Sequence, residues 1–456
     1  MAALKTLIVT IVVCIVAAIA FIAAARRPSI DPINPPPAKS FEPGLVERGA
    51  KLAAVGGCQT CHSAPGGRAF AGGLGLPTPF GTIYATNVTP DVETGIGSWS
   101  REAFQRAMRE GVDRAGRHLY PAFPYDHFTL ISDEDVSALY AYFMTREPVR
   151  ATTPANDVVF PMNVRQLIAG WKLLYLRPGP YQPDAAQSQE WNRGAYLVEG
   201  LAHCGACHTP RNVLGAENRQ ERYGGGQAEG FAAYALDRTS PAPVPWDAAA
   251  LRFYLRHGWQ EAHGVALGPM APVIDSLDSL STSDLDAIGV YMAPIIGTST
   301  TSGPRAAQRA LEQARAPDLA SKPGAGAAES GAKIYNAACA GCHQGGRPLP
   351  FGGIDLTLST GPSAPTARNV INVVLWGLPP AEGERNPIMP GFASVLNDEQ
   401  LAALLLYLRS RFSDRPAWTD IETEIRNART GPRPSTYPAH GTDPSQAIVS
   451  QRESQP

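Results

Sequence analysis

The sequence predicts a mainly α-helical protein in which one small, loop-rich domain occurs three times behind an N-terminal apolar helix. Three observations support this fold class. The motif C-x-x-C-H occurs three times, and a segment with the apolar spacing of a helix face closes each repeat. The chain also has 44 glycines and 42 prolines among 456 residues, more than the average usage of about 7% and 5%. The sequence therefore indicates tandem domains of one kind with many loops.

The charge balance excludes one class of function. The chain has 39 basic and 41 acidic residues, for a formal net charge of -2. Proteins that bind nucleic acid need a concentrated basic face, so we expect no nucleic-acid partner. Apolar residues make up 44% of the chain, which is sufficient for several buried cores.

The N-terminal segment is uncharged from residue 6 to residue 25 and is bounded by Lys5 and Arg26. A run of this length can cross the roughly 30 Å of membrane hydrocarbon as a helix, although secretory signals are also apolar and are cleaved. We expect residues 1–27 to be a transmembrane anchor or a signal segment. Residues 28–43 are rich in proline and are expected to form an extended spacer.

The cysteines carry the strongest signal. Six of the seven form pairs, and each pair is followed at once by a histidine: Cys58, Cys61 and His62; Cys204, Cys207 and His208; Cys339, Cys342 and His343. Two cysteines three positions apart can both form thioethers to one porphyrin, and the next histidine can bind its iron, so C-x-x-C-H is typical of covalent haem c attachment. Zinc sites also use C-x-x-C, but not as three separated single pairs. We therefore predict three covalently bound haem c groups.

Each motif has the same neighbours along the chain. A Gly-Ala pair in a predicted helix precedes it, at Gly49, Gly194 and Gly331. An apolar segment that ends at a glycine follows it, at Gly111, Gly258 and Gly377. A closing helix then begins at a capping residue that is followed three positions later by an acid or amide. The three capping residues are Ser132, Ser283 and Asn397. This common order predicts three copies of one domain.

A methionine sulfur is the usual sixth iron ligand in proteins with such motifs. Met270 and Met389 both lie 12 residues beyond the aligned glycine of their repeat, in loops that contain proline. Methionine also fills gaps in cores, but the same position in two repeats favours ligation. We predict that these two methionines are iron ligands of the second and third haems.

The first repeat departs from this pattern, because Phe123 occupies the corresponding position and cannot bind iron. His127 follows four residues later in the same loop, and a neutral imidazole there could be the sixth ligand and lower the potential of this haem. Met108 and Met144 are rivals whose positions are more typical of helix packing. A first haem that stays five-coordinate or takes some other ligand is the remaining alternative.

Domain boundaries follow from the gaps between repeats. We expect domains at residues 44–150, 188–297 and 328–412, joined by linkers at residues 151–187 and 298–327. The first linker is rich in proline, and the second is rich in Thr, Ser, Ala and Gly. Residues 413–456 lack an apolar period over most of their length and are expected to be a largely disordered tail.

The first repeat also contains stretches that are similar to a known family: GCQTCHSAPGGRAFAGG, TPFGTIYATNVTPDVETGIGSWS and GRHLYPAFPYDHFTLISDEDVSALYAYF. Residues 45–412 resemble the tri-haem cytochrome c subunits of membrane-bound periplasmic dehydrogenases, such as alcohol, gluconate, sorbitol, aldehyde and azaarene dehydrogenases. The YPAFPYDHF stretch is more similar to the versions that accompany molybdenum hydroxylases.

The resemblance implies three tandem class I cytochrome c-type domains and an electron conduit on the periplasmic side of the inner membrane, with no catalytic residues of its own. A catalytic partner subunit of molybdopterin, flavin or quinoprotein type would oxidise an aldehyde, alcohol or heteroaromatic substrate. The haems would pass the electrons to quinone or to a terminal oxidase. The alternative is a haem enzyme, such as a periplasmic peroxidase or a thiosulfate-oxidising cytochrome. An enzyme needs an open iron site and acid/base groups, and no paired acid/base set stands out in the sequence.

Overall fold

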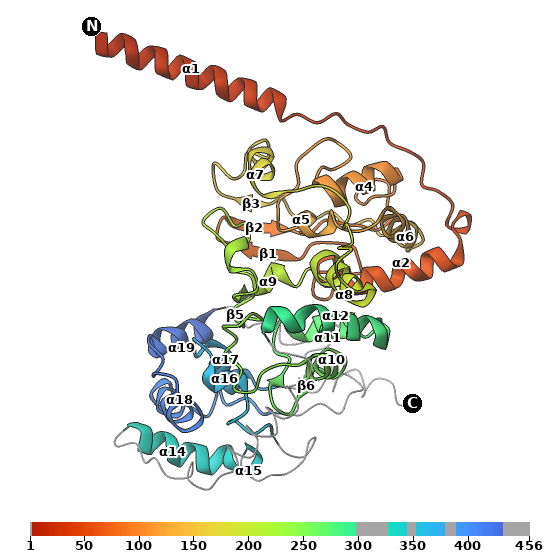
Figure 1. Cartoon of the computed structure of the whole chain (residues 1–456). Helices are drawn as coiled ribbons and strands as arrows, with labels where there is room; N and C mark the ends of the chain where they lie inside the picture. Colours follow the sequence, from red (N-terminus) through yellow and green to blue (C-terminus); the bar gives the residue numbers. More distant parts are fainter. Residues whose placement is uncertain (1, 298–326, 344–352, 379–388, 432–456) are drawn as a thin grey trace, which may run out of the picture.

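The computed structural model describes residues 2–297, 327–343, 353–378 and 389–431. Helix α1 (Ala2–Ala24) projects away from the body of the protein, and three helical units follow one another from its side to the opposite end (Figure 1). Within the described ranges, no helix has both the length and the apolar character that crossing a membrane requires. Of the two expectations for residues 1–27, a transmembrane anchor or a signal segment, this finding does not support the anchor.

Each unit is built on an early helix that crosses the last helix of the same unit. The pairs are α2 (Pro43–Val55) with α6 (Asp133–Met144), α8 (Gln189–Tyr196) with α12 (Thr282–Ile296), and α14 (Ala327–Ala338) with α18 (Asp398–Phe412). The early helix leads toward the first cysteine of the unit in every case. The crossing therefore determines where each C-x-x-C-H motif lies.

The glycine of each Gly-Ala pair lies at this crossing. A Cβ atom on Gly49, Gly194 or Gly331 would lie 2.0, 2.0 or 2.1 Å from a carbonyl oxygen of the facing helix, at Ala138, Ala287 or Ala403 respectively. No side chain fits at such a distance. The repeated glycine seen in the sequence is therefore a requirement of close helix packing.

The middle helix of each unit ends at a glycine, as predicted. These helices are α4 (Arg101–Glu110), α10 (Ala248–His257) and α17 (Arg368–Trp376). The following residues Gly111, Gly258 and Gly377 have φ of 58°, 72° and 76°, a region that L side chains rarely adopt. Their amides also bond to the carbonyl four residues earlier in the helix. Gly111 and Gly258 are left-handed caps, whereas Gly377 has ψ of -169° and turns the chain into an extended segment.

The closing helices begin at capping side chains. Ser132 and Asn397 cap α6 and α18 as predicted, and Asn397 forms a capping box with Gln400. Helix α12 is capped by Ser281, whose side chain accepts a hydrogen bond from the amide of Asp284. The expected cap, Ser283, already lies inside the helix. Ser281 has the extended backbone that an N-cap needs.

The strands are short and antiparallel. β1 (Gly75–Thr78), β2 (Gly81–Tyr84) and β3 (Asp157–Val158) form one sheet, in which Leu76 pairs with Ile83 and Gly81 with Val158. Two hairpins lie in the second unit: β4 (Gly226–Ala228) with β5 (Phe231–Ala233), and β6 (Trp259–Gln260) with β7 (Gly264–Val265).

The remaining short helical elements connect these parts. They are η1 (Ala38–Ser40), α3 (Cys58–His62), α5 (Tyr125–Phe128), η2 (Leu197–Leu201), α9 (Gly205–His208), η3 (Arg219–Glu221), α11 (Met270–Leu277), α15 (Ala340–His343) and α16 (Thr360–Ser363). Three of them, α3, α9 and α15, are the C-x-x-C-H turns.

The segment expected as the first linker contains β3 and a further helix, α7 (Leu167–Tyr175). Lys172 of α7 is buried, and its Nζ donates to the carbonyl oxygens of Glu110 and Gly111 at 2.6 and 2.5 Å. Burial lowers the pKa of Lys172 to about 7. Helix α7 therefore packs on the end of α4 as part of the first unit. No side chain caps its first turn, so the usual sequence signal for a helix start was absent.

The described part of the C-terminal tail contains a helix that the sequence did not predict. Helix α19 (Ile421–Thr430) packs against α17 and α18. Ile421, Ile425 and Trp418 are buried, and Trp418 Nε1 donates to the carbonyl oxygen of Ala364 at 2.8 Å. Most of the second expected linker, and the tail beyond residue 431, lie outside the described residues.

The first two units share one hydrophobic core, and the third has its own. Leu139 and Ile131 of the first unit belong to the same buried cluster as Leu201 and Leu285 of the second. The hydroxyl of Tyr196 in α8 also donates to Asp135 of α6 at 2.5 Å. The first two units therefore form one packed body.

A substitution within α2 tests the helix crossing. We expect Gly49→Ala to reduce the free energy of unfolding by roughly 1–3 kcal/mol, because the added Cβ meets the backbone of α6. Gly44→Ala in the same helix is the matched control, since a Cβ there has nothing within 4 Å. Denaturant unfolding of the complete protein measures both. Equal stability of the two variants would contradict the account.

Candidate functional site

The three C-x-x-C-H motifs form three similar helical turns. The first cysteine of each pair is half-buried and the second is exposed, and all six are free thiols. The first and third turns follow the early helix of their unit within a few residues, and the second follows α8 through η2. Both sulfurs of a pair are thus available on one turn for thioether bonds to a single porphyrin edge.

The histidine of each turn is held by a backbone carbonyl oxygen. The Nδ1 atoms of His62, His208 and His343 lie 2.6, 2.7 and 2.8 Å from the oxygens of Thr86, Tyr234 and Ile354 respectively. A carbonyl oxygen can only accept, so Nδ1 carries the proton and Nε2 keeps its lone pair. This is the arrangement in which histidine binds a metal ion.

Electrostatics supports the same protonation state. Burial lowers the pKa of His62 and of His208, and the bond to the carbonyl oxygen offsets only part of that effect. Both imidazoles are therefore neutral near pH 7. A neutral imidazole is the form that ligates iron.

The third unit shows a cavity beside its attachment turn. Cys339, Cys342 and His343 line it together with Met389, which lies in a backbone bridge with Leu378. Most of the remaining wall is apolar. Two thiols, a histidine with a free Nε2 and a thioether sulfur are the donor set that a covalently attached haem requires, so the residues fit this group.

Met270 and Phe123 occupy equivalent backbone positions. In both units the carbonyl oxygen of the capping glycine accepts a 2.7 Å hydrogen bond from the amide eight residues later in the chain. Phe123 in the first unit and Met270 in the second each lie four residues after that amide. Both side chains are half-buried against the shared core. The structure thus supports the alignment on which the ligand position was predicted, and ligation by Met270 stays a prediction.

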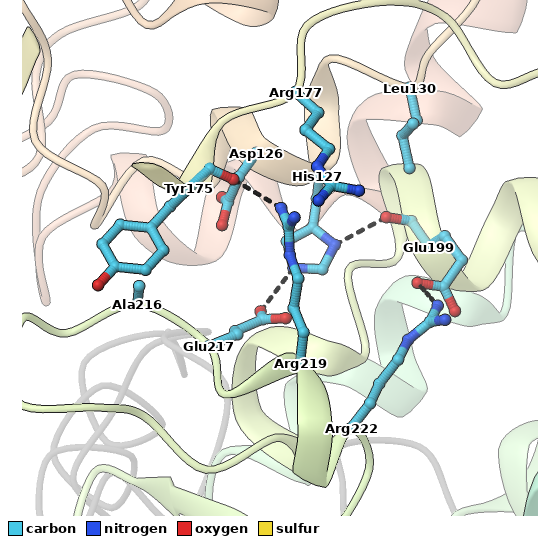
Figure 2. Close-up of a pocket in the computed structure, with 10 residues that line it drawn as sticks. All are labelled: Asp126, His127, Leu130, Tyr175, Arg177, Glu199, Ala216, Glu217, Arg219 and Arg222. Atoms are coloured by element: carbon cyan, nitrogen blue, oxygen red, sulfur yellow. Dashed lines mark hydrogen bonds and ion pairs between the residues drawn. The ribbon is translucent and has the colours of Figure 1, made fainter. Parts of the chain in front are cut away.

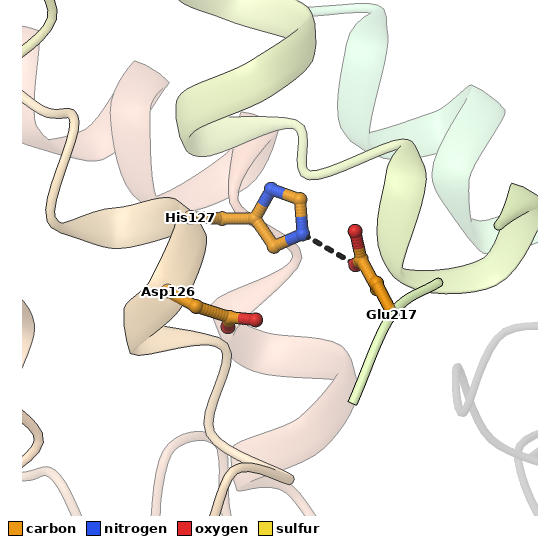
Figure 3. A group of neighbouring side chains, drawn as sticks. All are labelled: Asp126, His127 and Glu217. Carbon is orange, nitrogen blue, oxygen red and sulfur yellow. Dashed lines mark hydrogen bonds and ion pairs between the residues drawn. The ribbon is translucent and has the colours of Figure 1, made fainter. Parts of the chain in front are cut away.

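His127 lies at the contact between the first two units. Its Nδ1 is 2.7 Å from the carbonyl oxygen of Glu199. Its Nε2 is 2.7 Å from Glu217 Oε1, the contact drawn in Figure 3. Both partners belong to the second unit. Both ring nitrogens are therefore occupied, in contrast to the sixth-ligand role predicted for His127. Met108 and Met144 are buried in the shared core, as packing residues are.

A cavity of about 340 Å³ surrounds this pair (Figure 2). Burial alone would lower the pKa of His127, but the hydrogen bond and charge of Glu217 outweigh it and raise the pKa to about 9. Burial alone would raise the pKa of Glu217, but the hydrogen bond and charge of His127 outweigh burial and hold the pKa of Glu217 below its usual value. The two side chains therefore form a charged pair near neutral pH.

The pair lies next to the second attachment turn. A Cβ on Gly205, between Cys204 and Cys207, would be 3.2 Å from Glu217 Oε2 and 3.3 Å from His127 Cε1. Sequence reasoning missed Glu217, because nothing in its local sequence indicates a partner 90 residues earlier. The first and second turns are also close, since a Cβ on Gly56 would lie 3.1 Å from Leu201.

Two family models match the chain. Residues 46–147 match the model described as cytochrome c, and residues 326–408 match the model described as cytochrome C oxidase, cbb3-type, subunit III. Each match contains one attachment turn.

Several characterised proteins are similar over most of the chain. A nicotinate dehydrogenase subunit of Pseudomonas putida is 44% identical over 410 residues, which cover 89% of this chain and 34% of that protein. This chain thus spans about a third of the length of that relative. The fructose dehydrogenase cytochrome subunit of Gluconobacter japonicus is 34% identical, covering 88% and 85% of the two chains. The gluconate 2-dehydrogenase cytochrome c subunit of Pantoea cypripedii is 35% identical, covering 90% and 94%.

Replacing the predicted sulfur ligands tests their role. We expect Met389→Ala and Met270→Ala each to abolish one sulfur-to-iron absorption band near the red edge of the spectrum and to lower the potential of one haem. Met162→Ala serves as control, because Met162 lies in a separate small cluster. Spectra and potentials that match wild type in both ligand variants would contradict the assignment.

The pH dependence of stability tests the His127–Glu217 pair. Because the pKa of His127 is raised from 6.5 to about 9, its contribution is complete below pH 6.5 and is lost as the pH rises through about 9. Glu217 stabilises the folded protein at pH values above its ordinary pKa of 4.5, and this contribution decreases as the pH falls below 4.5. We expect Glu217→Gln to reduce stability by about 1–3 kcal/mol at pH 7 and to remove the decline between pH 6.5 and 9.

Thermal melting across this pH range makes the measurement, with Glu221→Gln as control, since Glu221 is exposed in the neighbouring short helix. The same decline in Glu217→Gln as in wild type would show that the pair makes no such contribution.

Proposed function

This chain belongs to the family of cytochrome c subunits of dehydrogenases, and from that premise we propose that it conducts electrons through three covalently bound haems. Members of this family are electron-transfer subunits rather than catalytic ones, and this chain is an electron-transfer subunit as well. The count of three is supported by one observation above all. The same contact between a histidine Nδ1 and a backbone carbonyl oxygen recurs at three attachment turns.

In each unit, different residues hold different parts of the haem. When bound, the haem supplies an iron that takes up and releases one electron. Each cysteine pair holds the porphyrin edge, and His62, His208 and His343 offer Nε2 to the iron. Met389 in the third unit and Met270 in the second would each offer a sulfur ligand to the iron, and such a ligand would raise the reduction potential.

The order of the units supports a stepwise path. The turns of the first and second units are close, and buried core residues join these units. The second and third units meet at Asn369 and Ala232. The Asn369 side chain accepts a hydrogen bond from the Ala232 amide at 2.8 Å and donates one to the Ala232 carbonyl oxygen at 2.9 Å. This packing of each unit against the next supports electron transfer between neighbouring units.

We propose that the catalytic partner oxidises a heteroaromatic substrate and is of the molybdopterin type. The higher identity to the nicotinate dehydrogenase subunit than to the fructose and gluconate dehydrogenase subunits supports this choice. A flavin or quinoprotein partner acting on an alcohol or aldehyde is the alternative. The electron acceptor is proposed to be quinone or a terminal oxidase.

We further propose a location on the periplasmic side of the inner membrane. Bacterial systems that couple haem to C-x-x-C-H act outside the cytoplasmic membrane, which supports export of the three units. Residues 1–27 would act at the membrane, either as a retained segment or as a signal that is removed. N-terminal sequencing of the mature protein distinguishes these two forms.

The haem count tests the core of this proposal. Mass spectrometry of the mature protein should show three added haem masses, because each of the three turns offers two free thiols. Cys339→Ala combined with Cys342→Ala should remove one haem and leave the other two. Two or fewer haems in fully matured wild type would refute the proposal.

The partner proposal has its own test. The chain purified with its catalytic subunit should show haem reduction when nicotinate or a related heteroaromatic is added without oxygen. The chain purified alone should accept electrons from dithionite but not from the substrate. Haem reduction by a sugar or alcohol, with none by heteroaromatics, would replace the proposed partner by the flavin or quinoprotein type.

A further inference from the structure

Two polar atoms of the second unit border the cavity of the third unit without a full set of hydrogen bonds. His263 Nδ1 is buried and has no hydrogen-bond partner among the described residues. The buried Tyr234 hydroxyl is approached by the side chain of Asn369 as a donor, but its own proton has no acceptor with hydrogen-bond geometry among those residues. Both residues line the cavity that also contains Cys342 and His343. A buried polar group without a hydrogen bond destabilises the folded protein, so a partner for these atoms is expected inside the cavity.

The cavity is polar where the second unit covers it. His263 and Tyr234 lie there with Ser359, Thr360 and Asn369 of the third unit. Thr360 Oγ1 donates to the carbonyl oxygen of His263 at 3.1 Å. Much of the remaining wall is apolar, including Val370, Val374, Leu404 and Leu408.

The distribution of polar groups on a haem c matches that of the cavity wall. Its thioether bonds lie at one edge, and its two propionate carboxylates lie on the opposite side of the porphyrin. Cys339 and Cys342 fix the thioether edge within the third unit. The propionates are the only charged acceptors that the group brings, and the Tyr234 hydroxyl and His263 imidazole lie among the polar residues.

We propose that Tyr234 and His263 donate hydrogen bonds to the propionates of the third haem, so that the second unit completes the binding site of that haem. This inference rests on the proposed function, because it requires the third haem to be attached. It assigns both residues a positioning role toward the haem rather than a role as iron ligands.

Both side chains are held in place before any haem binds. The His263 ring stacks on Trp246, with ring centroids 3.5 Å apart and planes at 9°. Strand β5 ends at Ala233, directly before Tyr234, and its Ala232 is bonded to Asn369 of α17. Figure 1 shows β5 next to α17. The donors therefore do not need to be ordered by the haem.

Tyr234 also has a second contact. Its carbonyl oxygen accepts the Nδ1 hydrogen bond of His208, the predicted iron ligand of the second haem, while its side chain lines the third cavity. One residue thus connects the ligand of one haem with the propionate side of the next.

The proposal has a defined effect on the third haem. A propionate charge near the iron favours the oxidised state, and hydrogen-bond donors weaken that influence. Loss of a donor should therefore lower the potential of the third haem and leave the other two unchanged. The third haem is identified as the one whose potential responds to Met389→Ala.

The test uses the complete chain with its haems. We expect Tyr234→Phe to lower the potential of the third haem and to shift the propionate bands in the resonance Raman spectrum. His263→Leu should act in the same direction, and the double variant should shift the potential further. Tyr125→Phe is the matched control, because it also removes a buried hydroxyl but lies in the first unit.

Three attached haems, with an unchanged third potential and unchanged propionate bands in both single variants, would overturn this inference alone. Fewer than three haems in wild type would instead refute the proposed function on which it rests. A shift of the third potential in Tyr125→Phe equal to that in Tyr234→Phe would also overturn the inference.

Discussion

The close crossing of two helices in each unit is the constraint on which the other features depend. A glycine lets the early helix approach the closing helix so closely that a Cβ on that glycine would lie only 2.0–2.1 Å from a carbonyl oxygen of the closing helix. Because each attachment turn follows the early helix, directly or in the second unit through η2, this contact sets the position of both cysteines and the histidine. The carbonyl oxygen that holds the histidine Nδ1 then determines which ring nitrogen is free.

The units are joined by different kinds of contact. The first two share a hydrophobic core, to which the charged His127–Glu217 pair adds a polar contact beside the second attachment turn. The third has its own core and meets the second through hydrogen bonds of Asn369 and Thr360. Such contacts suit an electron-transfer protein, because they fix the spacing of neighbouring redox centres without joining their iron sites.

Local signals in the sequence predicted the local parts of this structure. The three attachment turns, the glycines that end the middle helices, and the caps at Ser132 and Asn397 are all short-range features. Helices α7 and α19 were missed, because α7 has no capping side chain and both are stabilised by distant contacts such as those of Lys172 and Ile425. His127 was assigned by its distance along the chain. Its partners, Glu199 and Glu217, lie 72 and 90 residues away in another unit, and no sequence period reveals such a contact.

The central claim is that one chain holds three separate one-electron centres. The most direct measurement is an anaerobic reductive titration of the purified chain, with the electrons taken up per chain counted from the haem absorbance. The account predicts three electron equivalents per chain, with Cys339→Ala/Cys342→Ala taking up two. Uptake of two or fewer electrons by the wild-type chain would contradict it.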